Sequence, residues 1–199
     1  MIAGLLLAAG ASRRFGTDKL LASLDGRPVL RWSAAALQRA TDLLYVVMPP
    51  DASAYAAALR DVPHHPVPHA GRAEGMGSSL RAGIVALRGE QTPVDAVVVA
   101  LADQPTVDPA VIAALVARWR AGGAAAVAPR YRDGRGHPVL FDRGCFDRLA
   151  ALAGDRGARA VLDSLGDALA LVAVEGDAPP DVDTPEVLAA LARSAASAG

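Results

Sequence analysis

The sequence predicts a three-layer α/β fold, in which helices cover both faces of a mostly parallel central sheet. Short continuous apolar runs recur along the chain, and they lack in–out alternation, which is typical of strands buried on both faces. Segments with helical periodicity separate these runs. Strands that alternate with helices in this way favour a doubly wound sheet with right-handed crossovers.

Six apolar runs are the predicted strands. They lie at residues 2–8, 43–48, 94–102, 124–128, 139–141 and 168–174. The first run resembles the apolar part of a signal peptide. It lacks a preceding positive segment and leads directly into a loop with candidate functional residues, so we interpret it as a strand. No run reaches the roughly 18 apolar residues of a membrane span, so we expect no membrane association.

Three stripes of apolar or small side chains with helical spacing predict the main helices. They comprise Val29, Ser33 and Leu37; Leu80, Ile84 and Leu87; and Val111, Ile112, Leu115, Val116 and Trp119. Pro28 and Pro109 stand where a first helical residue tolerates a missing N–H. Asp108 and Thr184, each followed by proline, are predicted N-caps. The glycine- and arginine-rich segments 70–79 and 130–138 are predicted to be loops over a site.

The length and charge of the chain limit its organisation and its partners. Its 199 residues predict one domain over residues 1–191, followed by a flexible tail at 192–199. A net charge of −1 and scattered arginines give no electrostatic footprint for nucleic acid. Cys145 is the only cysteine, which excludes an internal disulfide and favours a reducing, cytoplasmic location.

The loop after the first predicted strand is the strongest candidate for a binding site. Residues 8–11 are small, so a ligand can approach the backbone closely, and their N–H groups can cradle phosphate oxygens. Arg14 and Lys19 would add positive charge for a polyphosphate. Lys19 is the only lysine among 20 basic residues, and its compact ammonium suits a point contact to a crowded phosphate. The alternative is a solvated turn with surface charges.

This loop matches neither of the two familiar phosphate-binding motifs. A P-loop requires lysine directly after its second glycine, whereas Thr17 and Asp18 separate Gly16 from Lys19. The dinucleotide-binding pattern of three glycines is also absent after Gly10. The loop therefore needs a different interpretation.

Two carboxylates follow other predicted elements. Asp103 comes directly after a buried strand, and Asp183 lies in the segment DVDTPE at 181–186. Carboxylates at strand ends can hold Mg²⁺ that bridges phosphates. With Lys19 nearby they would form a site for metal-assisted phosphoryl or nucleotidyl transfer. The alternatives are a turn residue for Asp103 and a helix entry for Asp183.

Other reactive side chains are weaker candidates. His137 either meets an acceptor or has no ligand at all, and the three histidines in PHHPVPH at 63–69 lack zinc-ligand spacing and are interpreted as loop residues. Cys145 lacks the local context of a nucleophile. Trp32 and Trp119 fall in predicted helices and are expected in the core. Arginines of the two predicted loop regions would fit an anionic ligand; they are Arg72, Arg130, Arg132 and Arg135.

Five motifs in order along the chain resemble those of the MobA-like NTP transferase family. They are LAAGASRRFGTDK at 7–19, GMGSSLRAGI at 75–84, LADQP at 101–105, GRGHPVLF at 134–141 and DVDTPE at 181–186. The combination is most similar to the molybdenum cofactor cytidylyltransferases. LAAG resembles the cytidylyl branch, whereas the guanylyl branch usually has LAGG. Gly77 departs from relatives that have serine there, which removes a side-chain contact at that position.

This resemblance implies a Rossmann-like nucleotidyltransferase that transfers CMP from CTP to the phosphate of a pterin-type acceptor, the molybdenum-molybdopterin cofactor, and releases pyrophosphate. The implied catalytic residues are Lys19, Arg14 and Asp103, of which the first two would hold the phosphates. The nucleotide would be bound by Leu7, Ala8, Ala9, Gly10, Ser78 and Ser79, and Mg²⁺ by Asp103 and Asp183. A molybdoenzyme would receive the product.

Two other functions stay open from the sequence. One is the same chemistry with another base or acceptor, such as guanylyl transfer. The other is a non-catalytic maturation factor that binds the molybdenum cofactor and hands it to a molybdoenzyme. An intact set of Lys19, Arg14 and Asp103 disfavours this second alternative.

Overall fold

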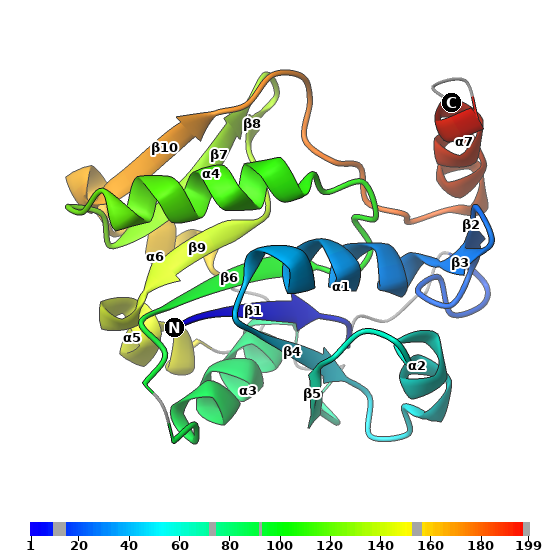
Figure 1. The fold of residues 1–199 in the computed structure, drawn as a ribbon, viewed down its shortest axis with the longest axis horizontal. Helices are drawn as coiled ribbons and strands as arrows, with labels where there is room; N and C mark the ends of the chain where they lie inside the picture. The colour runs from blue at the N-terminus through cyan, green and yellow to red at the C-terminus, as the bar shows by residue number, and fades with distance from the viewer. Residues whose placement is uncertain (10–14, 72–74, 92, 153–156, 197–199) are drawn as a thin grey trace.

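A mixed eight-stranded sheet with helices on both faces forms the centre of the computed structural model, which describes residues 1–9, 15–71, 75–91, 93–152 and 157–196 (Figure 1). Its strands are β1 (Ile2–Leu7), β4 (Leu43–Met48), β5 (His65–Pro68), β6 (Ala96–Leu101), β7 (Ala126–Tyr131), β8 (Gly134–Arg135), β9 (Val139–Asp142) and β10 (Leu169–Ala173). The strand order is β10-β7-β9-β6-β1-β4-β5, and β8 pairs with β7. The predicted fold class is confirmed.

Helices cover the two faces of this sheet (Figure 1). The helices are α1 (Val29–Ala40), α2 (Ser53–Ala58), α3 (Met76–Arg88), α4 (Pro109–Arg120), α5 (Phe146–Ala150), α6 (Arg159–Asp163) and α7 (Pro185–Ala196); short 3₁₀ turns are η2 (Arg143–Cys145) and η3 (Gly166–Ala168), and β2 (Ser23–Leu24) and β3 (Arg27–Pro28) form a separate small hairpin. Leu6 faces the core under α1 and α4, and its neighbour Leu5 faces the core under α3, α5 and α6. Successive residues of a strand point to opposite faces, so a continuous apolar strand supplies both cores.

Strand β1 lies in the middle of the sheet and sets the position of the candidate site. It runs parallel to β4 on one side and to β6 on the other, with Leu7 opposite both Val47 and Leu101. The carboxyl ends of β1 and β6 therefore meet at one edge of the sheet. This is the edge where ligands bind in open α/β folds.

The predicted strands and caps agree with the structure except at a few elements. Asp108 caps α4 by accepting from the Ala110 N–H, and Pro109 is the first residue of that helix, as predicted. Pro28 instead occupies the position just before α1. The predicted loop 70–79 is too long, because α3 begins at Met76. Helix α7 extends to Ala196, within the segment expected to be a tail.

Strand β5 is the main element that the sequence interpretation missed. Its segment contains Pro66 and Pro68, and we expected a loop there. Among the described residues the strand pairs with β4 alone, at the edge of the sheet, and edge strands tolerate proline because one side of their backbone has no partner strand. The rings of His65 and Tyr45 stack with their centres 4.8 Å apart. Strand β9 is also antiparallel to both neighbours, so the mostly parallel sheet is mixed.

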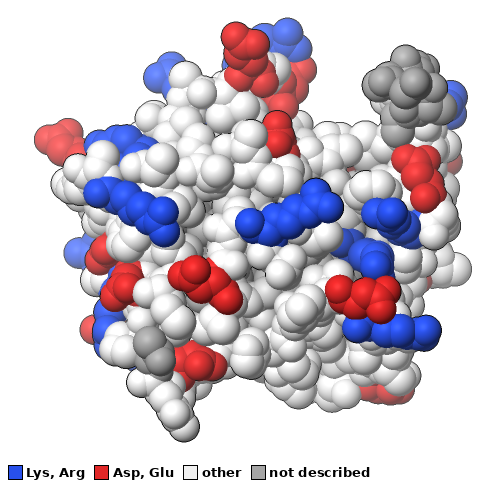
Figure 2. Space-filling view, in the orientation of Figure 1, with Lys and Arg blue, Asp and Glu red and all other residues white. Residues whose placement is uncertain are grey.

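The surface and the helix lengths bear on the expected partners. On the face drawn in Figure 2, basic and acidic side chains of the described residues lie interspersed. Among the helices of the described ranges, none has the length and apolarity to cross a membrane.

Trp32 and Trp119 pack partly buried against the core, as expected, and their indole N–H groups donate to Leu24 O and to Asp142 Oδ2.

Candidate active site

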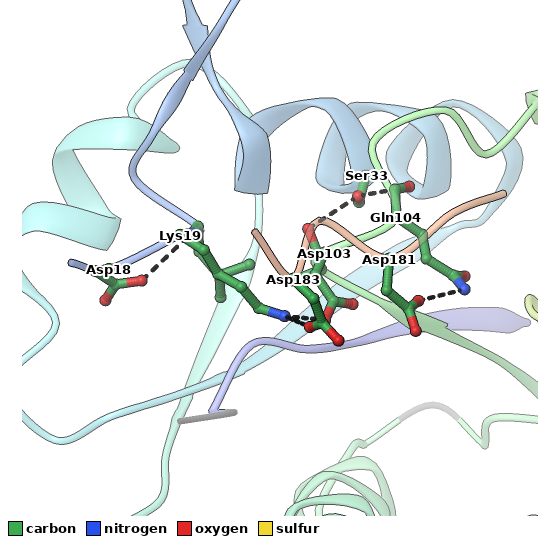
Figure 3. Close-up of polar contacts among 9 residues, drawn as sticks. Asp18, Lys19, Ser33, Asp103, Gln104, Asp181 and Asp183 are labelled. Carbon is green, nitrogen blue, oxygen red and sulfur yellow. Dashed lines mark hydrogen bonds and ion pairs between the residues drawn. The ribbon is translucent and has the colours of Figure 1, made fainter. Parts of the chain in front are cut away.

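Three charged side chains meet at the carboxyl ends of β1 and β6. Lys19, from the loop after β1, donates from Nζ to Asp103 Oδ2 and to Asp183 Oδ1, at 2.7 Å in each case (Figure 3). Asp103 lies in the turn after β6, and Asp183 lies in the segment before α7. The structure therefore brings together three of the predicted site residues, with one ammonium group bridging two carboxylates.

The burial of this cluster makes its charges interact strongly. Lys19 is 8% exposed, and the side chains of Asp103 and Asp183 are 22% and 45% exposed. Burial by itself lowers the pKa of Lys19, but the hydrogen bonds and charges of the two carboxylates outweigh it and hold that pKa above its ordinary value. Lys19 is therefore a cation at neutral pH.

The loop that carries Lys19 is fixed by the residue before it. Asp18 Oδ1 accepts from the backbone N–H of Leu20 at 3.1 Å, and Asp18 Oδ2 accepts from the Tyr55 hydroxyl at 2.7 Å. Tyr55 is buried in α2 and packs in the core beneath α1. These bonds hold the backbone on either side of Lys19. The sequence interpretation assigned no role to Asp18 or Tyr55.

The turn that carries Asp103 is held from two sides. The hydroxyl of Ser33, a fully buried residue of α1, donates to the carbonyl oxygens of Ala102 at 3.2 Å and Gln104 at 3.1 Å (Figure 3). The backbone N–H of Val182 donates to the Asp103 carbonyl at 2.8 Å. The second bond places the segment with Asp183 beside the turn after β6. The sequence predicted Ser33 only as part of a helix face.

A third carboxylate, Asp181, lies beside this cluster and was not predicted. Its Oδ1 accepts from Gln104 Nε2 at 2.9 Å (Figure 3). Burial raises the pKa of Asp181, and the charges of Asp103 and Asp183 raise it further, against the opposing effects of Gln104 and Lys19. The motif DVDTPE contains both Asp181 and Asp183, and only Asp183 was predicted as a site residue.

The donor set is suited to a divalent cation that also binds phosphate. Within the described ranges, no three His, Cys, Asp or Glu side chains gather into a metal site of their own. Mg²⁺ commonly binds through one or two carboxylates and completes its coordination with water and substrate phosphate. Asp103 and Asp183 fit this pattern, since they already share a cation, the Lys19 ammonium.

The other predicted nucleotide-binding residues are divided between the end of β1 and α3. Leu7, Ala8 and Ala9 are buried at the end of β1, and the Ala8 N–H donates to Val47 O at 2.8 Å. That amide is bonded within the sheet, and the binding of a nucleotide by Leu7, Ala8 and Ala9 stays a prediction. Gly10 and Arg14 lie outside the described residues.

Ser78 and Ser79 lie in the first turn of α3 and are buried. The Ser78 hydroxyl lies 2.8 Å from the carbonyl oxygen of Gly75, and His69 Nε2 lies 2.9 Å from the same hydroxyl. Ser78 therefore joins α3 to the end of β5. His69, which we interpreted as a plain loop residue, takes part in this junction.

His137 lies in the segment between β8 and β9, close enough to Asp103 and Asp181 for their charges to act on it. Burial lowers its pKa, and a hydrogen bond with the Val99 backbone and the charges of Asp181 and Asp103 act in the opposite direction. Its Nδ1 is buried with no hydrogen-bond partner among the described residues, and its carbonyl accepts from the Tyr131 hydroxyl at 3.0 Å. Burial raises the pKa of that hydroxyl to about 12, with help from acidic neighbours. Cys145 is buried away from this cluster, against the α3 and α5 core.

Two of the loop arginines have intramolecular partners. Arg132 is paired with Asp177, and Arg135 with Asp163. Arg130 is exposed on β7, and Arg72 lies outside the described residues. Arg132 and Arg135 would have to leave these partners to bind an anionic ligand.

Comparisons with known sequences point to one family. Residues 4–169 match the model of the MobA-like NTP transferase domain. The chain is 32% identical to the purine catabolism protein PucB of Bacillus subtilis (strain 168), over 92% of each chain. It is 37% identical to a probable molybdenum cofactor guanylyltransferase of Chloroflexus aggregans, over 70% of this chain and 64% of that protein.

Solved structures agree in fold. Rv0371c of Mycobacterium tuberculosis superposes with a TM-score of 0.82 at 34% identity, over 96% of this chain and 97% of that one. A manganese complex of Rv0371c gives a TM-score of 0.78 at 32% identity, over 97% and 98% of the two chains. A CMP:2-keto-3-deoxy-manno-octonic acid synthetase complexed with CTP shares the fold, with a TM-score of 0.77 at 14% identity over 100% and 99% of the chains.

Proposed function

The chain belongs to the MobA-like NTP transferase family, and we propose that it transfers CMP from CTP to the phosphate of the molybdenum-molybdopterin cofactor and releases pyrophosphate. The observation that carries the proposal is the bridge from Lys19 to Asp103 and Asp183 at the carboxyl ends of β1 and β6. This bridge joins a cation for phosphates to two carboxylates for a metal at the ligand-binding edge of the sheet.

The proposed chemistry is an in-line displacement at the α-phosphorus. An oxygen of the acceptor phosphate forms a bond to this phosphorus, while the bond from it to the oxygen that bridges to the β-phosphate breaks. Pyrophosphate leaves with that bridging oxygen and its electron pair. The acceptor phosphate is ionised near neutral pH, so no strong general base is needed, and positioning and charge stabilisation supply the catalysis.

The residues of the cluster have separate tasks in this scheme. Lys19 neutralises charge that develops on the leaving pyrophosphate, and Arg14 assists it. Asp103 and Asp183 would hold Mg²⁺, which when bound stabilises negative charge on the phosphates. Asp18 and Ser33 keep the loop of Lys19 and the turn of Asp103 in position through their hydrogen bonds.

The choice of CTP depends on Ala9, at the end of β1. Ala9 is 2% exposed, and its methyl group would crowd a purine more than glycine would. The name of the Chloroflexus aggregans relative favours a second candidate, guanylyl transfer by the same residues. The product would pass to a molybdoenzyme, and we place the reaction in the cytoplasm.

Pyrophosphate release tests this function. The purified protein is assayed with CTP, GTP and ATP in the presence of Mg²⁺ and the molybdenum-molybdopterin cofactor. We expect release with CTP. Release with GTP alone would overturn the cytidylyl assignment. If none of the three nucleotides supports pyrophosphate release, the result would favour a non-catalytic maturation factor.

The variant Ala9→Gly tests the choice of base. Removing one methyl group from a binding site changes selectivity by about 10-fold or more. We expect the ratio of kcat/KM for CTP to that for GTP to fall by about 10-fold. An unchanged ratio would show that Ala9 does not select the base. It would leave the proposed role of Lys19 unchanged.

A further inference from the structure

We propose that the Lys19 ammonium competes with a divalent cation for the Asp103–Asp183 carboxylate pair. The metal then binds tightly only after a polyphosphate has replaced the two carboxylates as the partner of Lys19. The inference rests on the proposed function only in taking a nucleoside triphosphate as the polyphosphate. It adds to that function an order of events at the same site: the substrate phosphates draw Lys19 away, and this opens the carboxylates to the metal.

The geometry places a cation where the metal ligands converge. Nζ of Lys19 lies 2.7 Å from one oxygen of each carboxylate. A metal ion held by the same pair would lie against this ammonium, on the side of Lys19 and Asp103, which are more buried than Asp183. Two positive charges at such a distance repel strongly where water screens them little.

The Lys19 ammonium should stay paired with the two carboxylates until another anion binds it. Lys19 is 8% exposed, and its Nζ lies 2.7 Å from an oxygen of each of the two carboxylates. A buried charge that loses its partner without replacement is strongly disfavoured. A triphosphate offers the replacement. Binding of the metal and of the polyphosphate then favour each other, as linkage requires.

Backbone contacts restrict this exchange to side chains. The backbone beside Lys19 is held by Asp18, which accepts from the Leu20 N–H and the Tyr55 hydroxyl. The turn of Asp103 is held by Ser33 and by Val182. The flexible four-carbon stem of Lys19 is therefore the part that moves between the carboxylates and the phosphates.

Manganese titration of the protein without nucleotide tests the competition. Mn²⁺ binding is followed by electron paramagnetic resonance in the wild type, in Lys19→Met and in Arg88→Met. Arg88→Met is a matched control, because it also removes one positive charge from an ion pair. Arg88 lies at the end of α3 and pairs with Asp147. We expect Lys19→Met to bind Mn²⁺ at least about 10-fold more tightly than the wild type, and Arg88→Met to bind it equally.

An equal or weaker affinity in Lys19→Met would overturn the proposal. Lys19→Gln provides a second neutral variant if the methionine variant fails to fold, and circular dichroism checks the fold of each. Absence of pyrophosphate release with every nucleotide would contradict the proposed function but would not change the manganese result, so the two failures are distinguishable.

The single lysine of the sequence allows a direct test in the wild-type protein. Lysine labelled with ¹³C at Cε gives one side-chain signal, from Lys19. A non-hydrolysable α,β-methylene analogue of CTP together with Mg²⁺ should shift this signal, and a saturating concentration of Mg²⁺ alone should shift it too. A Lys19 signal that stays unchanged while Mg²⁺ saturates the carboxylates would show that the two cations do not compete.

Discussion

Two ion pairs of this protein use the same chemistry in different surroundings. At the carboxyl ends of β1 and β6, Lys19 is buried and shares its charge between two carboxylates that are 84 and 164 residues away in the sequence. Near the start of β6, Arg88 of α3 pairs with Asp147 of α5, and these side chains are 41% and 92% exposed. Burial and the number of partners separate a site from a surface contact.

The largest effect is expected at the buried cation. Lys19→Ala removes the charge that offsets the leaving pyrophosphate, and removing one such preorganised group commonly costs about 100- to 1000-fold in kcat. The measurement is the rate of pyrophosphate release with CTP and Mg²⁺. Activity within a few-fold of the wild type would show that the assignment of Lys19 is wrong.

The two carboxylates should differ in their effect on stability. Asp103→Asn takes one of two anions from a buried ammonium and is expected to lower the free energy of unfolding by about 1–3 kcal/mol. Asp183→Asn should cost less, because the Asp183 side chain is 45% exposed and water can replace part of its contact. Urea denaturation of both variants measures the difference. A larger loss in Asp183→Asn would contradict the burial argument.

Ser33 tests whether the turn of Asp103 depends on a buried hydroxyl. Ser33→Ala removes one donor from each of two carbonyl oxygens, of which that of Gln104 keeps the Val107 N–H, and it should lower the free energy of unfolding by about 1 kcal/mol. Turnover should fall as well, since the turn carries Asp103. Ser164→Ala is the matched control, because Ser164 is exposed and its hydroxyl donates to Val161 O, within its own segment. Equal losses of stability and turnover in the two variants would show that Ser33 does not support the site.

The smallest effect is expected at the exposed pair. Arg88→Ala should change the free energy of unfolding by less than about 0.5 kcal/mol, because solvent screens such a pair. Pyrophosphate release should be unchanged. A loss comparable to that of Asp103→Asn would show that exposure is a poor guide to the importance of ion pairs in this chain.

The alternation of buried strands and amphipathic helices was readable from local sequence. The runs that became β1, β4 and β6 are continuous in apolar residues, and such runs predict strands that lie between two layers of helices. Strand β5 was not readable, since its two prolines indicate a loop and only the free side of an edge strand accommodates them.

Three charged residues of the site were predicted from the sequence, but its other residues and their arrangement were not. A lone lysine after β1 and an aspartate directly after β6 lie at the carboxyl ends of parallel strands, so the sequence indicated that Lys19 and Asp103 meet there. Only the tertiary structure decided that Lys19 bridges Asp103 and Asp183, that Asp181 joins Gln104 beside them, and that Ser33 holds the turn. Local patterns fix elements over a few residues, whereas these contacts depend on how distant segments pack.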